Sequence, residues 1–224
     1  MNSHVRTEGG RPQMFYKAND YSLLLGIKGF SRTLLENHFA LYEGYIKNSN
    51  KLLETLAQLL EEGNTATLQF SEIERRLAFE LNGIHLHEMY FENMSKAVNG
   101  EPSKETYFYK KVVSQFGSFA AWKKSFRAVA SMRGVGWAIT IYDPRAEILI
   151  NTWVDEHHLG HVAGAVPVLI LDLWEHALLL DYGSDREKYI DAFFNILDWT
   201  VVSLRFAKAT EFQESYAVWR KAEP

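Results

Sequence analysis

The chain carries four ionisable residues at positions where the surrounding pattern is apolar. His38 and His87 each fall in phase with the apolar residues of a helical stripe. Asp172 ends the most apolar run of the sequence, and His176 follows four residues later. Imidazole and carboxylate groups are very unfavourable in a core without partners, so these four must hydrogen-bond to one another or bind a metal.

The rest of the composition narrows the chemistry of such a site. The 224-residue chain contains no cysteine, which excludes thiolate zinc sites, iron–sulfur clusters and cysteine nucleophiles. Three histidines and one aspartate suit a divalent or trivalent first-row metal, with room left for water. A lone histidine on an apolar face is more often a satisfied core residue, and spacing alone does not prove that the four positions converge, so both interpretations stay open.

Helical periodicity places the first two histidines on a pair of long helices. Ser31 is the expected cap of the first helix, which runs to about residue 62. The second helix is expected to begin at Ser71, with Glu74 completing a capping box, and to continue to Gly100. A short turn between two long helices predicts a helical hairpin.

The pattern changes after Pro102. Two shorter helical stretches come first, and segments rich in isoleucine, threonine and aromatic residues then predict a β-hairpin and a third, fully apolar strand. The expected helices cover 105–116 and 119–132, the strands cover 137–142, 147–153 and 166–171, and a last helix from near residue 184 has Tyr189, Phe193, Ile196, Trp199 and Val202 on one face.

These elements predict an α+β fold in two parts. Residues 15–102 are expected to form an N-terminal long α-helical hairpin, and residues 103–224 a C-terminal α/β domain with a three-stranded antiparallel sheet. Residues 1–14 are polar and contain glycine, so we expect a flexible tail there.

Charge and hydropathy exclude several classes of function. The 24 Lys and Arg residues against 28 Asp and Glu residues give a net charge of -4, which argues against an extended nucleic-acid surface. No apolar run approaches the roughly 20 residues that a membrane span needs. The first residues lack the apolar stretch of a signal peptide. We therefore expect a cytoplasmic protein with no nucleic-acid or membrane partner.

Residues 172–177 resemble a family signature. The run Asp172-Leu173-Trp174-Glu175-His176-Ala177 matches the Asp-x-Trp-Glu-His-Ala motif of the iron/manganese superoxide dismutases. This resemblance implies that His38, His87, Asp172 and His176 bind one iron or manganese ion per subunit. It also implies the activity, in which superoxide is converted to dioxygen and hydrogen peroxide by one-electron cycling of the metal. The ligand set does not distinguish iron from manganese.

Position 83 bears on the surroundings of that metal. Iron-type members often carry a glutamine four residues before the second ligand histidine, whereas this chain has Gly83, as manganese-type members commonly do. Manganese-type members supply a glutamine between the second and third strands, and this chain has none there. We expect His157 to fill the space above Gly83 and to hydrogen-bond the solvent on the metal, with Glu156 and His158 as the alternatives. Close helix packing is the other interpretation of Gly83.

The resemblance assigns roles to four more residues. Tyr45 matches the family tyrosine at the mouth of the substrate funnel, although its spacing of seven residues from His38 is one shorter than in many members. Trp137 and Trp174 would form an apolar cage that excludes water. Arg186 resembles an arginine that lends positive charge near the funnel. A core or interface tyrosine and a surface arginine are the simpler interpretations.

Glu175 implies a homodimer. In the family this glutamate reaches across a two-fold interface to the ligand histidine of the other subunit, here the partner subunit's His176. Members usually carry an aromatic pair after His-Ala, and its tyrosine meets a histidine of the partner's first helix. In this chain Leu178 and Leu179 occupy the positions of the aromatic pair, and Tyr42 occupies the position of the histidine. These changes indicate a repacked interface and an altered proton route.

Two other functions compete with dismutation. A family-derived metal-binding or structural protein would keep the fold and lose the redox chemistry, and a broken ligand set would be its mark. A His/Asp site for hydrolysis or metal storage would favour further carboxylates near the ligands, and Glu156 alone is available. The intact set of four ligand positions favours the dismutase.

Overall fold

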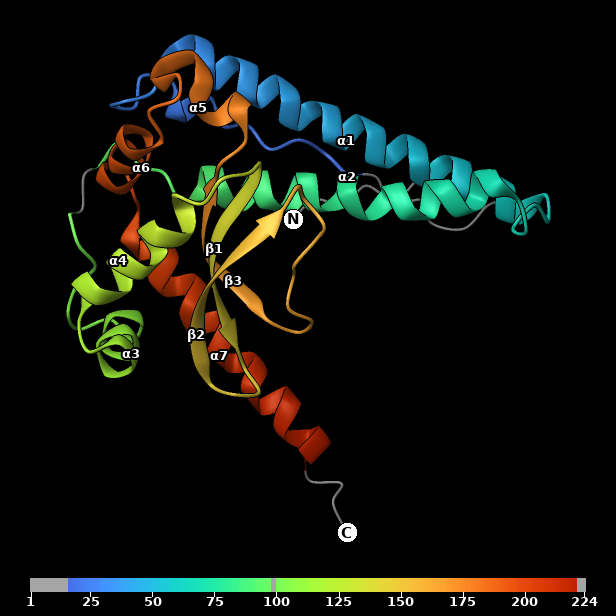
Figure 1. The fold of residues 1–224 in the computed structure, drawn as a ribbon. Helices are drawn as coiled ribbons and strands as arrows, with labels where there is room; N and C mark the ends of the chain where they lie inside the picture. Colours follow the sequence, from blue (N-terminus) through green and yellow to red (C-terminus); the bar gives the residue numbers. More distant parts are fainter. Residues whose placement is uncertain (1–15, 98–99, 221–224) are drawn as a thin grey trace.

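The computed structural model describes residues 16–97 and 100–220, with side chains as far as residue 211. After the short 3-10 helix η1 (Ser22–Leu24), helices α1 (Arg32–Glu61) and α2 (Leu68–Glu92) form an antiparallel hairpin that extends far beyond the rest of the molecule (Figure 1). The hairpin prediction is therefore confirmed. The expected tail, 1–14, lies outside the described residues.

Hydroxyl side chains cap the two long helices. The Leu34 amide donates to the Ser31 hydroxyl at 3.1 Å, as the sequence predicts. The second helix begins four residues earlier than expected, because Thr67 caps it by accepting from the Phe70 amide at 3.2 Å. The expected cap, Ser71, lies inside the first turn, and its hydroxyl donates to the Thr67 carbonyl. Sequence alone does not distinguish two hydroxyl residues four positions apart.

The second helix also ends earlier than the periodicity predicts. Its last residue is Glu92, because the next three residues pair with a distant segment. The Ser95 amide donates to the Ile196 carbonyl at 2.8 Å, and the Asp198 amide donates to the Asn93 carbonyl at 2.7 Å. These bonds satisfy backbone groups that a longer helix would have used.

The same pairing divides the expected last helix in two. Helix α6 (Arg186–Asn195) is followed by residues 196–198 and then by α7 (Trp199–Arg220). The Asp198 carboxylate accepts from the Thr200 amide at 2.9 Å at the start of α7. The predicted apolar face survives the interruption, since Tyr189, Phe193, Ile196, Trp199 and Val202 are all at most 4% exposed.

Three strands form the predicted antiparallel sheet, in the order β2-β1-β3. They are β1 (Gly136–Asp143), β2 (Ile148–Asp155) and β3 (Val166–Asp172). Trp137 pairs with Val154 on one side and with Asp172 on the other. The start of β1 and the ends of β2 and β3 therefore share one edge of the sheet.

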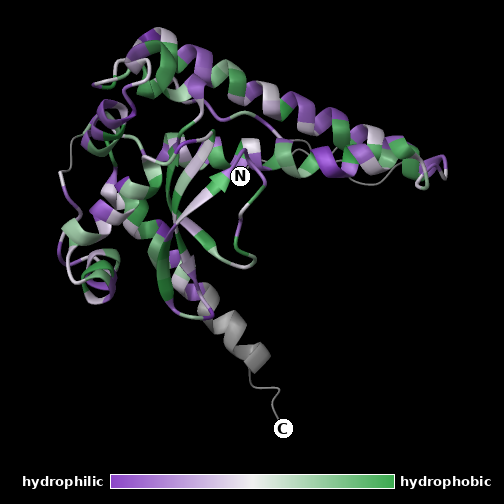
Figure 2. Cartoon of the chain, in the orientation of Figure 1, coloured by the Kyte–Doolittle hydropathy of each residue, from purple (hydrophilic) through white to green (hydrophobic). Residues whose placement is uncertain are grey.

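Helices surround this sheet and complete the core. Helices α3 (Tyr107–Phe116), α4 (Phe119–Ala130) and α7 pack on it, and α2 crosses the end of β3 (Figure 1). An element that the sequence did not predict, α5 (Glu175–Tyr182), follows β3 and packs against α1. Figure 2 shows apolar colour along the strands and alternating polar and apolar colour along α1. Within the described residues, no helix is both long enough and apolar enough to cross a membrane.

Candidate metal centre

Four elements bring the predicted ligand residues to one point. His38 comes from α1, His87 from α2, Asp172 from the end of β3 and His176 from the first turn of α5. Their ligand atoms all lie within 4.8 Å of one another. Three of the side chains are fully buried, and that of His176 is 20% exposed. Residues separated by as many as 138 positions, from His38 to His176, therefore form one compact donor set.

The distances within this set fit a shared metal ion. The Asp172 Oδ2 atom lies 3.2 Å from His38 Nε2, 3.5 Å from His87 Nε2 and 3.2 Å from His176 Nε2. The His87 and His176 Nε2 atoms are 3.4 Å apart. Ligand atoms about 2.1 Å from a common ion lie roughly 3.0–4.2 Å apart at angles from 90° to 180°. Three imidazole nitrogens facing one carboxylate oxygen match that arrangement.

The protonation of the set also suits metal binding. His87 Nδ1–H donates to the Gly83 carbonyl at 2.6 Å, which leaves the Nε2 lone pair facing the centre. Burial lowers the pKa of His38 and of His87, so both rings are neutral at pH 7. Burial opposes ionisation of Asp172, but the imidazoles of His176 and His38 outweigh it and hold its pKa well below the usual value. The donor set is thus imidazoles with one carboxylate.

The backbone around Asp172 orients its carboxylate. The Trp174 amide donates to Oδ1 at 2.9 Å, which leaves Oδ2 to face the histidines. The Tyr189 hydroxyl donates to the Asp172 carbonyl at 2.7 Å, and Tyr90 pairs with Tyr189 at 2.9 Å. One carboxylate oxygen is therefore held by the protein and the other is directed at the centre.

A second group of polar contacts lies beside the ligands. The Trp137 indole donates to His157 Nδ1 at 3.1 Å, and His157 Nε2 lies 2.7 Å from the Tyr45 hydroxyl. Burial lowers the pKa of His157 to about 4, so the ring is neutral at pH 7. Because its Nδ1 accepts from an indole N–H, the neutral ring carries its hydrogen on Nε2 and donates it to Tyr45.

A backbone turn selects His157 over its two neighbours. Glu156 has a left-handed φ of 50°, which reverses the chain directly after β2. His157 is fully buried as a result, whereas the side chains of Glu156 and His158 are 49% and 27% exposed. His157 is therefore the one of the three that contacts both Tyr45 and Trp137.

The space over Gly83 differs from the expectation. A Cβ atom at Gly83 would lie 2.6 Å from Cδ1 of the Tyr45 ring, closer than real contacts allow. The nearest group above this glycine is therefore Tyr45, and the expectation that His157 fills the space is wrong. The missing side chain lets Tyr45 lie against α2 with its hydroxyl directed at His157.

Aromatic rings enclose the donor set. Trp137 is fully buried and lies 5.0 Å from the His87 ring. Trp174 stacks on two imidazole rings, with ring centres 4.7 Å apart for His157 and 5.8 Å apart for His176. Both tryptophans thus have the positions that the predicted apolar cage requires.

Two residues of the site escaped the sequence analysis. The Phe79 ring lies 4.6 Å from that of His157. Phe79 precedes His87 by eight residues on the same face of α2, so helical spacing could have identified it. Tyr189 was predicted as part of an apolar face, and no sequence signal indicates that its hydroxyl supports Asp172.

Arg186 connects α6 to the loop before β1. Its guanidinium donates to the Met132 carbonyl and, at 2.9 Å, to the Gly134 carbonyl. These bonds fix the side chain against backbone oxygens. Its contact with an anion on the way to the metal site stays a prediction.

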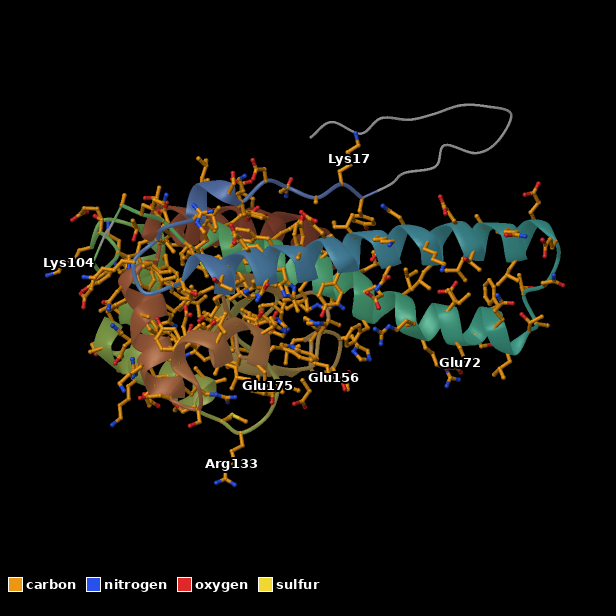
Figure 3. The ribbon with its side chains drawn as sticks, turned by 90° about the horizontal axis from the view of Figure 1, so that it is seen from above. Lys17, Glu72, Lys104, Arg133, Glu156 and Glu175 are labelled. Carbon is orange, nitrogen blue, oxygen red and sulfur yellow. The ribbon has the colours of Figure 1, made fainter. Side chains whose placement is uncertain are left out.

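The positions expected at a subunit interface divide into buried and exposed ones. Tyr42 is 1% exposed, and its hydroxyl donates to Glu88 of the same chain at 2.6 Å. Leu178 is buried and Leu179 is 55% exposed. Glu175 is exposed at the start of α5, on the same side of the molecule as Glu156 (Figure 3). Tyr42 is therefore engaged within its own chain.

Comparison with known families accounts for this arrangement. Residues 29–95 match the family model described as iron/manganese superoxide dismutases, alpha-hairpin domain, and residues 104–205 match that for the C-terminal domain. The chain belongs to the iron/manganese superoxide dismutase family. Both the resemblance and the fold class predicted from sequence are confirmed.

Relatives carry both metals in their names. A superoxide dismutase [Mn] 1 of Halobacterium salinarum is 35% identical over 180 residues, covering 80% of this chain and 88% of the relative. A superoxide dismutase [Fe] of Pyrobaculum aerophilum is 34% identical over 178 residues, covering 79% and 83%. A superoxide dismutase [Fe] of Aquifex pyrophilus is 33% identical over 194 residues, covering 84% and 90%. The family is one of oxidoreductases, and iron or manganese is its metal.

Proposed function

We propose that this protein disproportionates superoxide to dioxygen and hydrogen peroxide. The observation that carries the proposal is the convergence of His38, His87, Asp172 and His176 within 4.8 Å beside the Tyr45–His157 contact. These four residues would hold one iron or manganese ion, which would supply the one-electron redox chemistry. Two superoxide anions and two protons thereby yield one dioxygen and one hydrogen peroxide.

The chain itself must supply an oriented proton donor. His157 donates to the Tyr45 oxygen, which leaves the Tyr45 hydroxyl hydrogen free to point elsewhere. Burial, followed by the charges of Asp172 and Glu80, raises the pKa of Tyr45, so the phenol stays protonated at neutral pH. Tyr45 is half-buried and can face solvent and substrate. We assign Tyr45 as a donor and His157 as the residue that orients it.

The aromatic enclosure has an electrostatic role in this proposal. Trp137, Trp174 and Phe79 replace water around the imidazoles with rings, which lowers the local dielectric constant. Charges act more strongly in such surroundings than in water. Arg186 is proposed to add positive charge on the approach of the anion.

We also propose a homodimer formed through the Glu175/His176 region. The Glu175 carboxylate makes no hydrogen bond with the described part of its own chain, and the adjacent His176 is partly exposed. Leu179 and Leu180, at 55% and 58% exposed, lie on the same short helix and would be covered by a partner. Light scattering of the protein and of Glu175→Ala tests this, and a monomeric wild type would contradict it.

The proposed setting is the cytoplasm, with superoxide as partner and no nucleic acid. The acidic balance of the chain, with a net charge of -4, supports the absence of a nucleic-acid partner. Cell fractionation checks the location.

The test of the activity is reconstitution with each metal separately. Protein refilled with iron alone or manganese alone should bind close to one ion per chain, and at least one form should dismutate superoxide. A family member that binds metal without dismutating is the competing function. Stoichiometric metal in both forms with no activity in either would establish that competitor.

A further inference from the structure

The described residues contain two buried carboxylates, and the metal centre uses one of them. Besides Asp172, Glu80 on α2 is only 2% exposed. The Arg76 Nε–H donates to Glu80 Oε1 at 2.7 Å, and Nη2 lies 2.7 Å from the same oxygen; Asn48 donates weakly to Oε2 at 3.4 Å. Burying a carboxylate is unfavourable without a compensating charge, so Arg76 is its essential partner.

The pair is joined to the site through a ring. The Arg76 guanidinium carbon lies 4.0 Å above the centre of the Phe79 ring. The centre of that ring lies 4.6 Å from the centre of the His157 ring and 6.2 Å from the centre of the Tyr45 ring. Arg76 is therefore one aromatic side chain away from the proposed proton donor.

This is also the open side of the site. His38, His87 and Asp172 are buried, whereas Tyr45, Phe79, Trp174 and His176 are all partly exposed. A small anion must approach past these partly exposed side chains. The Arg76 side chain is itself 55% exposed beside Phe79, so its charge faces that approach.

The two members of the pair bring opposite charges to the ring that borders Tyr45 and His157. Removing one member alone would leave the other uncompensated next to an anionic substrate.

We propose that the Arg76–Glu80 pair sets the charge at the opening of the site, with Glu80 restraining the attraction that Arg76 exerts on an incoming anion. This inference rests on the proposed function for its substrate, superoxide. With a net charge of -4 the molecule as a whole repels anions, so a local cation at the opening favours their approach.

Two opposite substitutions test the pair. Glu80→Gln keeps the shape and frees the Arg76 charge, so kcat/KM for superoxide should rise about two- to fivefold at low salt. Arg76→Gln leaves the negative charge of Glu80 uncompensated beside the approach of the substrate, so kcat/KM should fall by about fivefold or more. The double variant should return to near the wild-type value.

Azide binding gives a readout that does not depend on turnover. Azide is a small monoanion, and its dissociation constant on metal-loaded protein can be followed by absorption. It should tighten in Glu80→Gln and weaken in Arg76→Gln, and both differences should shrink as salt rises. A pair with a purely structural role would shift the unfolding midpoint and leave azide affinity unchanged.

Arg75→Gln is the matched control. Arg75 is the preceding residue of α2, its side chain is 77% exposed, and it pairs with the exposed Glu72 at 3.6 Å. The same loss of charge there should leave azide affinity and kcat/KM within about twofold of wild type. An effect as large as that of Arg76→Gln would overturn the proposal, because net charge alone would then explain it.

The outcomes separate this inference from the proposed function. Opposite shifts of azide affinity in the two variants support the charge control even if the wild type fails to dismutate superoxide, a result that would overturn the proposed function alone. An active wild type with unchanged azide affinity and kcat/KM in Glu80→Gln overturns the charge control alone. If Arg76→Gln fails to fold, Glu80→Gln and Arg76→Lys, which keeps the charge, decide the matter.

Discussion

The two ends of the helical hairpin have the same secondary structure and different surroundings. At the inner end, His38 and His87 are fully buried among the sheet and α5. At the outer end, α1 and α2 pack only against each other among the described residues and extend away from the sheet (Figure 1). Leu35 near the inner end is 0% exposed, whereas Leu60 near the outer end is 51% exposed.

This contrast shows where the hairpin obtains its stability and its function. Helices gain most of their stability in proteins from tertiary packing of an apolar face. The inner turns gain that packing and can hold buried ligands in fixed positions. The outer turns bury fewer side chains, Leu56 and Leu59 of α1 among them, so changes on their exposed faces should be tolerated while changes at the buried positions of the inner end are not.

The largest effect is expected from Asp172→Asn, which removes the charge that all three imidazoles face. Metal content should fall below about a tenth of wild type. Activity should fall by more than the roughly 10- to 100-fold that is lost when a hydrogen-bond partner of a metal ligand is removed. Metal analysis and a dismutase assay measure both. Asp155→Asn, an exposed residue at the same edge of the sheet, should keep its metal. Full activity without metal would refute the site.

Truncation of two leucines compares a core-facing position at the inner end with a solvent-facing position at the outer end. Leu35→Ala should lower the free energy of unfolding by about 2–5 kcal/mol, because it opens a cavity in a closed core. Leu60→Ala should change it by about 0.5 kcal/mol or less. Urea unfolding of both variants measures the difference. Equal losses would mean that Leu60 is packed as tightly as Leu35.

Between about pH 6.5 and 4, acid should destabilise the protein mainly through the buried histidines at and beside the inner end. The lowered pKa values of His38, His87 and His157 mean that the native state binds fewer protons than the unfolded state below about pH 6.5. The metal-free protein should lose stability as the pH falls from about 6.5 towards 4, by up to about 1.4 kcal/mol per pH unit for each histidine. Asp172 stays ionised in this range. Urea midpoints should fall less steeply for His157→Gln, and a flat profile for wild type would contradict the assignment.

Two glycines of the hairpin provide the finest comparison. Gly83→Ala places a Cβ 2.6 Å from the Tyr45 ring and should destabilise the protein by about 1–3 kcal/mol. Gly44→Ala on α1 meets nothing within 4 Å and should stabilise it by about 0.5–1 kcal/mol. Thermal unfolding of the two variants measures the opposite signs. A neutral Gly83→Ala would show that Tyr45 moves aside freely.

The fold and the ligand positions were largely predictable because they follow from local periodicity. His38 and His87 interrupt apolar helical stripes, and Asp172 ends an apolar strand, so each is visible as a polar residue in an apolar pattern. The family signature around His176 then places these residues together. The structure brings all four to one point.

What the sequence could not supply depends on contacts between distant segments. The end of α2 and the division of the last helix both result from backbone pairing between residues 93–95 and 196–198, which no local pattern signals. The position of the Tyr45 ring over Gly83 likewise depends on how two helices approach each other. Charge pairs such as Arg76–Glu80 look like ordinary surface spacing until burial is known.

The register of β1 on β3 has a consequence for assembly. Trp137 and Asp172 are opposite each other, and an irregularity between Thr140 and Ile141 sets that alignment. Side chains alternate between the faces of a strand, so a slip of one residue would turn the aspartate away from the histidines and the indole away from His157. No ligand set can therefore exist until the sheet has paired in its native alignment. Metal uptake during refolding would therefore report that the strands have paired in their native register.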